Sequence, residues 1–267
     1  MLKIYTILVF IILIIVLIVL TQYIKYHFVN YNKNVYKWHC DNIYPFHTKL
    51  TKKETIYIEK CIDLSWWELL RPFYMRKDPF IKRLSYFTYS HRVVNEKVNS
   101  SRIAYGSVIN PSIVYEFSKE ILNERGIKSE IVPNNNIIFG GLGWDFEEKH
   151  FKTYFRFKNF KNLSLKYQKL MGNMENKCND GIISITYDTT GIVLEIKVYC
   201  YSKNENIAEL KSKFRHDIQK DCNGLEKWNL NTNGNNILEL YKKSGYKLDT
   251  ITYKDKNNYT VYFPQIG

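Results

Sequence analysis

The residues most capable of chemistry in this sequence are lysines, arginines and tyrosines that alternate with apolar residues in short segments. Alternate positions of the segment His150–Phe157 are occupied by Lys152, Tyr154 and Arg156. In a second segment, Lys197 stands between the apolar residues Ile196 and Val198. Successive side chains of a strand point to opposite faces, so each segment predicts a strand with one apolar and one Lys/Tyr-bearing face. Lys, Arg and Tyr together suit a phosphorylated or otherwise anionic ligand.

Two surroundings are open for this polar face. If helices cover the apolar face of the sheet, the polar face is exposed to solvent. If the sheet closes into a barrel, the same side chains line the lumen and can enclose a ligand.

The elements that carry these residues form a recurring pattern. Hairpins are predicted over 137–157, 182–201 and 248–263, and further strands over 81–89 and 102–109. Helices are predicted over 52–73, 110–125, 163–171, 207–222 and 236–244. The return strands of the hairpins read KTYF at 152–155, KVYC at 197–200 and TVYF at 260–263. This similarity predicts a repeated helix–hairpin unit, although strand composition in a tyrosine-rich chain offers another explanation.

Helix–strand–strand units with basic and tyrosine residues on one strand face resemble the αββα (ABBA) aromatic prenyltransferases. In that family an antiparallel barrel ringed by helices holds an isoprenoid diphosphate with Lys, Arg and Tyr. The resemblance covers residues 51–263, and Thr260 stands where the other return strands have Lys. It implies that the diphosphate contacts are Lys152, Tyr154, Arg156, Lys197, Tyr199 and Tyr262.

Two local signals predict element ends. Asn110-Pro111 suits a helix start, with Asn as N-cap and Pro at the first helical position, and Gly126 suits its end. The glycine cluster at 140–143 matches no phosphate-binding motif and predicts a β-bulge or a close backbone approach. Asp145 after it suits a turn, or an acid/base role if a lumen exists.

An uncharged apolar run, Ile4–Ile24, precedes this region. Its 21 residues would span about 31 Å as a helix, enough to cross the hydrocarbon core of a bilayer. No small-residue cleavage site follows it, so an uncleaved signal-anchor is predicted over 1–24. A juxtamembrane stalk is expected over 25–50 and one basic α+β domain over 51–267.

Charge favours one orientation and one class of partner. Lys25, Lys33 and Lys37 follow the apolar run and only Lys3 precedes it, so the positive-inside rule predicts a cytoplasmic domain. The net charge of +13 is scattered among acids. The bilayer and its anionic headgroups are therefore expected partners, and nucleic acid is not.

Cysteine and histidine spacing predicts neither a metal nor a cofactor. The five cysteines contain no CxxC pair, and the histidines no HExxH motif. Pairing of Cys178 with Cys222 stays open.

Two functions follow from these patterns. The first is a single-pass membrane protein that acts as a binding or structural component of a viral or organellar membrane. The alternative is a membrane-tethered ABBA-like transferase for an isoprenoid or lipid diphosphate.

Overall fold

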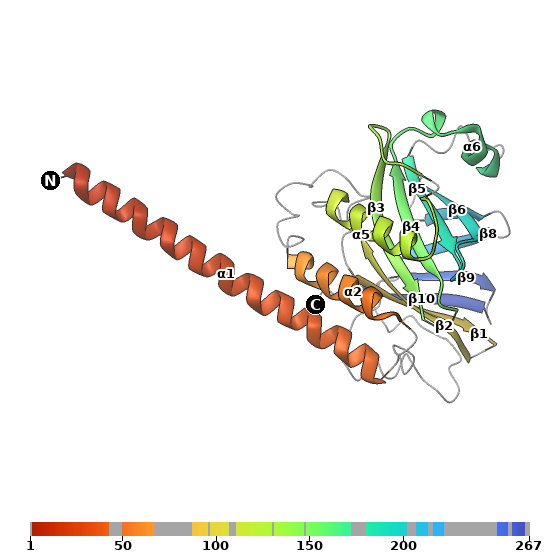
Figure 1. Ribbon diagram of the computed structural model, residues 1–267, viewed down its shortest axis with the longest axis horizontal. Helices are drawn as coiled ribbons and strands as arrows, with labels where there is room; N and C mark the ends of the chain where they lie inside the picture. The colour runs from red at the N-terminus through yellow and green to blue at the C-terminus, as the bar shows by residue number, and fades with distance from the viewer. Residues whose placement is uncertain are drawn as a thin grey trace.

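A computed structural model describes residues 2–42, 50–66, 87–95, 97–106, 111–129, 131–146, 148–171, 180–201, 207–212, 216–221, 250–255 and 258–264. Figure 1 shows a long N-terminal helix that projects from a mixed helix–strand domain. The helices are α1 (Leu2–Asn42), α2 (Lys52–Leu64), α5 (Pro111–Glu124), the 3₁₀ turn η3 (Phe160–Asn162) and α6 (Leu165–Met171). The strands are β1 (Phe87–Val94), β2 (Lys97–Gly106), β3 (Ile137–Asp145), β4 (Phe151–Phe157), β5 (Asp180–Tyr187), β6 (Val193–Tyr201), β7 (Ile207–Ser212), β8 (His216–Asp221), β9 (Thr250–Asp255) and β10 (Asn258–Pro264).

Strands β1 to β6 pair consecutively into a six-stranded antiparallel sheet. Taken alone, these six strands form an open sheet. The backbones of β7, β8, β9 and β10 continue the antiparallel pairing from β6, and β10 pairs with β1. The mixed α+β class and the antiparallel sheet predicted from the sequence are therefore confirmed.

The predicted helix over 207–222 is wrong, because the chain forms β7 and β8 there. Ile207, Leu210 and Ile218 have helical spacing, but so short an apolar pattern does not distinguish a helix from a strand. The free backbone edges of β6 and β9 pair with this segment and decide its conformation. The helix predicted over 52–73 is also too long, because α2 ends at Leu64 with Ser65 as its C-cap. The predicted helix over 236–244, Cys178 and Cys222 lie outside the described residues.

Helix α5 begins and ends as its sequence predicts. Pro111 is its first residue, and Gly126 follows its last turn with φ of +72°. The N–H groups of Gly126 and Ile127 donate to the carbonyls of Asn123 (3.0 Å) and Leu122 (2.9 Å). Glycine reaches this left-handed conformation without a side-chain clash, so it closes the helix here.

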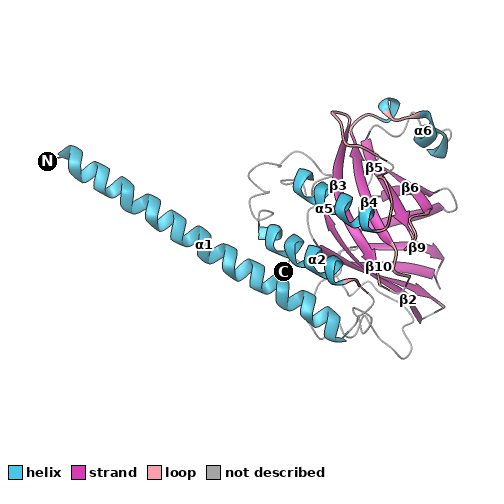
Figure 2. Ribbon diagram, in the orientation of Figure 1, coloured by secondary structure: helices cyan, strands magenta, loops and turns pink. Residues whose placement is uncertain are grey.

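Helix α5 lies over one face of the sheet at β3 (Figure 2). The side chains of this face are apolar and buried. Tyr115 of α5 lies over Phe139 of β3 with ring centroids 5.3 Å apart, and Phe139 meets Phe155 of β4 at 5.4 Å. The remaining large buried rings include Phe87, Tyr105, Trp144 and Phe151. Aromatic packing on this scale supplies the core that the high aromatic content predicts.

Helix α1 is continuous through the predicted stalk as far as Asn42. Its apolar side chains from Tyr5 to Leu20 are 45–67% exposed, and the helix is long and apolar enough to cross a membrane. Further along, Val29, Asn32, Val35 and His39 are buried against the domain, and the His39 ring stacks on Tyr89 of β1 at 3.6 Å. The second half of α1 is therefore part of the folded domain.

Candidate functional site

The strand register places the six candidate residues on one face of the sheet, opposite the helices. Lys152, Tyr154 and Arg156 of β4 lie across from Thr186, Ser184 and Ile182 of β5, which in turn lie across from Glu195, Lys197 and Tyr199 of β6. Directly paired residues of neighbouring strands project from the same face. The paired series Tyr262–Ser90–Arg102–Asp145 links β10 to this face through β1, β2 and β3.

The central lysines of this polar face are buried. Lys152 is 6% exposed and Lys197 is 7% exposed, although both lie on the face that the helices leave uncovered. The sequence left open whether this face is exposed to solvent or lines a lumen. For these two lysines, exposure to solvent is wrong. Tyr154 and Arg156 are half-buried. The side chains of Tyr199 and Tyr262 lie outside the described residues, so only their backbone register is known.

Two carboxylates on this face are already engaged in ion pairs. Arg102 Nε donates to Asp145 Oδ2 at 2.6 Å across β2 and β3. Lys197 Nζ lies 2.7 Å from Glu195 Oε2 on the same strand. Burial alone would raise the pKa of Glu195, but Lys197, then Lys152 and Arg102, bring it below its ordinary value. Glu195 is thus held as a carboxylate.

Lys152 lies between these two pairs, and no carboxylate among the described side chains forms an ion pair with it. Burial lowers the pKa of Lys152 well below its ordinary value, and the charges of Arg102 and Lys197 lower it further. Asp145 and Glu195 act in the opposite direction but do not offset this effect. Among the described side chains of the polar face, basic groups outnumber acidic ones, because Arg156 adds a further positive charge. The face can therefore accept negative charge from a ligand.

The glycine cluster lets strand β3 approach its neighbours closely. The register of β3 against β4 shifts between Phe139 and Gly141, which confirms the bulge predicted from the sequence. A Cβ at Gly141 would lie 2.3 Å from the Tyr105 carbonyl oxygen. Gly143 lies directly across from Lys152, and a Cβ there would meet the Tyr154 ring at 3.3 Å. The missing side chains thus give Tyr154 its place on the polar face.

Sequence reasoning missed Arg102, although it noted Asp145 as a residue for a lumen. The pair forms because Arg102 and Asp145 are directly opposed in the β2–β3 register, 43 positions apart in the chain. The alternation of β2 places Arg102 on the same face as Ala104, which is the signal that could have found it. Asp145 also caps the turn after β3 by accepting from the Glu148 N–H at 3.4 Å.

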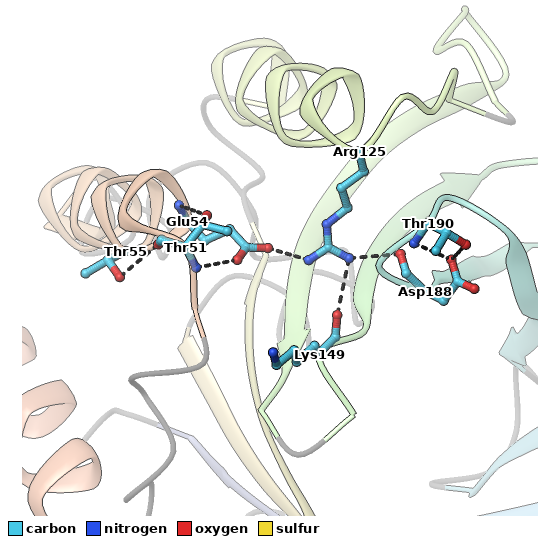
Figure 3. Close-up of polar contacts among 7 residues, drawn as sticks. All are labelled: Thr51, Glu54, Thr55, Arg125, Lys149, Asp188 and Thr190. Carbon is cyan, nitrogen blue, oxygen red and sulfur yellow. Dashed lines mark hydrogen bonds and ion pairs between the residues drawn. The ribbon is translucent and has the colours of Figure 1, made fainter.

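A second buried charge cluster joins the helices to two hairpin turns (Figure 3). Arg125, just after α5, forms an ion pair with Glu54 of α2 and donates to the carbonyls of Lys149 (3.3 Å) and Asp188 (3.1 Å). Glu54 also completes a capping box with Thr51. Since every contact of this cluster joins parts of the fold, its role is structural.

Among the residues that the structure describes, no group of three or more His, Cys, Asp or Glu side chains is placed to hold a metal ion. Cys40 and Cys61 are free thiols. No protein-family model matches this sequence, and no curated protein matches it either. The geometry of the polar face is therefore the basis for a functional proposal.

Proposed function

We propose that this protein is a single-pass membrane protein whose α+β domain binds an anionic, phosphate-bearing ligand inside a barrel of strands. It would act as a binding component of a membrane, such as a viral or organellar membrane. The length and apolar surface of α1 support a bilayer crossing, and the lysines after Ile24 favour a cytoplasmic domain.

Closure of the sheet is supported by the backbone pairings. The pairing order β1-β10-β9-β8-β7-β6-β5-β4-β3-β2 returns to β1 through the β1–β2 ladder. A closed sheet has an inner face, and the helices contact the apolar face. The polar face would then line the lumen.

The observation that carries the proposal is the burial of Lys152 beside two ion pairs whose carboxylates are already used. In the part of the chain that the structure describes, no carboxylate pairs with Lys152. A buried ammonium without its own counter-charge is costly, so such a site gains most from a bound anion. A diphosphate or phosphate ester supplies several acceptor oxygens with negative charge. Lys197, Arg156 and the Tyr154 hydroxyl would provide further donors.

The test is thermal unfolding of the full chain in detergent with inorganic diphosphate added. A ligand at 100 times its Kd stabilises a protein by about 2.7 kcal/mol. For a chain of this size that corresponds to a rise in Tm of about 5–10 °C. The double variant Lys152→Ala with Lys197→Ala should lose this rise.

The matched control is Lys128→Ala with Lys161→Ala, which removes the same charge from two exposed positions. This variant should keep the full diphosphate-dependent rise in Tm. Equal loss in both double variants would mean that diphosphate acts through general surface charge. No rise in the unmodified protein would refute the ligand-binding proposal.

A second candidate function is a membrane-tethered transferase that uses an isoprenoid or lipid diphosphate. It is favoured by the combination of helices on the apolar face and basic residues on the other. Release of inorganic diphosphate from farnesyl diphosphate in the presence of an aromatic acceptor would test it. Binding without release would leave the protein a binding component.

A further inference from the structure

Helix α1 joins the apolar run to the folded domain without a break. The run ends at Ile24, and α1 continues as helix to Asn42. A helix rises about 1.5 Å per residue, so each position after Ile24 has a defined height along the helix axis. The apolar run is therefore connected to the domain by residues 25–42 of α1, which are a continuous helix and not a flexible linker (Figure 1).

The contacts between residues 25–42 of α1 and the domain begin immediately after the apolar run. Asn32 Nδ2 donates to Ser65 Oγ at 2.5 Å, and Lys33 Nζ forms a 2.9 Å ion pair with Asp63. Val29 is 9% exposed and Val35 is 2% exposed. These residues lie along one stripe of the helix, since positions three or four apart share a face. They fix the C-terminal end of α2 beside the part of α1 that follows the membrane segment.

The contact nearest the apolar run joins Lys25 to Trp66. The ammonium of Lys25 lies 5.3 Å from the centre of the Trp66 ring, and Trp66 also packs against the core while remaining half-buried. Lys25 is the first charged residue after the run. In a spanning helix such a residue lies at headgroup level, and Trp is enriched at this depth because its ring is apolar and its N–H is polar.

We propose that Trp66 lies at the membrane–water interface and that Trp66 and Lys25 bring the folded domain into direct contact with phospholipid headgroups. This inference rests on the bilayer crossing of α1 in the proposed function, but not on any ligand of the polar face. The partner is the headgroup layer of a phospholipid bilayer, which contacts the C-terminal end of α2.

The experiment is tryptophan fluorescence of the full chain in phosphatidylcholine vesicles whose acyl chains carry bromine near the headgroups. Bromine quenches an indole that it touches. The Trp66→Phe variant should lose a clear part of the bromine-dependent quenching. The matched control is Trp38→Phe, because Trp38 lies on α1 about 21 Å beyond Ile24 and its ring should therefore not contact bromine. Unchanged quenching in Trp66→Phe would overturn the inference.

A second variant keeps every contact of Trp66 and moves only the bilayer. Four polar residues inserted between Ile24 and Lys25 should lengthen α1 between the membrane segment and the domain by about 6 Å, or slightly more than one helical turn. Quenching should then fall with Trp66 still present, and quenching that stays at the original level would contradict the inference.

Extraction with alkaline carbonate tests the bilayer crossing of α1 separately from the position of Trp66. If carbonate releases the unmodified chain from membranes, the bilayer crossing itself fails. If the chain stays in the membrane but Trp66→Phe leaves quenching unchanged, only the position of Trp66 is wrong.

Discussion

At the residue scale, Lys152 is the side chain whose position is hardest to explain by stability alone. It is 6% exposed, and the carboxylates of Asp145 and Glu195 are bound to other cations. Burial lowers its pKa well below the value that it would have in the unfolded chain. A residue that weakens the folded state is more easily understood as part of a binding site than as part of the core.

Replacing Lys152 by Met should therefore stabilise the protein in the absence of ligand. Replacement of other buried ions by apolar residues has given up to about 4 kcal/mol. In the unmodified protein the folded-state pKa lies below the unfolded one, so the unfolded chain binds more protons between the two values. The advantage of Lys152→Met should be full below the folded pKa and disappear as pH approaches the unfolded value. Denaturant unfolding across pH measures it, and an advantage that grows with pH would contradict this account.

Gly141 provides a second test at this scale. Gly141→Ala places a Cβ 2.3 Å from the Tyr105 carbonyl oxygen and 2.9 Å from the Gly106 Cα, both of which belong to the backbone of β2. The matched change is Gly126→Ala, which meets no atom within 4 Å and costs about 1 kcal/mol through its left-handed backbone. Thermal unfolding should show a larger loss for Gly141→Ala. Equal losses would mean that β2 and β3 separate easily.

At the scale of elements, the Arg125 cluster determines how the helices sit on the sheet. The guanidinium joins the start of α2 to the turns after β3 and β5, and it lies 5.7 Å from the Phe151 ring. Buried ion pairs add little when both partners are present, but the loss of one partner leaves the other charge buried alone. The cluster therefore makes the relative placement of these elements specific.

Arg125→Met should destabilise the domain by about 3–5 kcal/mol, because Glu54 is left buried at 5% side-chain exposure without its cation. Glu54→Gln should cost less, since the amide oxygen can still accept from the Thr51 N–H. In the double variant the total loss should be smaller than the sum, which urea unfolding can measure. Strict additivity would show that the two side chains act independently.

At the scale of the whole molecule, α1 has two halves with different surroundings. The first half exposes apolar side chains all round, and the second half packs into the domain through Val35 and His39. This division explains how one continuous helix can serve both a bilayer and a folded domain.

Ile14→Arg combined with Leu17→Arg should abolish carbonate-resistant membrane association. Arg in the centre of a spanning helix costs about 2.5–3.5 kcal/mol per residue. The Tm of the domain should stay unchanged, because these side chains are 45% and 64% exposed. Leu17→Ile is the apolar control and should remain in the membrane. A chain with both arginines that resists carbonate would refute the spanning helix.

Orientation calls for a separate measurement. The positive-inside rule predicts a domain that faces the cytoplasm, so added protease should spare it in intact cells but cut it in sealed organelles, whose outer surface is cytoplasmic. Permeabilised membranes provide the control, in which the domain should be cut. Digestion in intact cells, or protection in sealed organelles, would reverse the predicted orientation.

The sequence by itself determined the features that depend on local periodicity. The apolar run, the alternating faces of β4 and β6, the bulge at the glycine cluster and the limits of α5 each follow from residues close together in the chain. Only the tertiary structure decided that Lys152 and Lys197 are buried, that Arg102 meets Asp145, that residues 207–212 and 216–221 pair as strands and that α1 packs against the domain. These features depend on contacts between distant segments, and local composition does not encode which backbone edge a segment meets or which face of a sheet becomes enclosed.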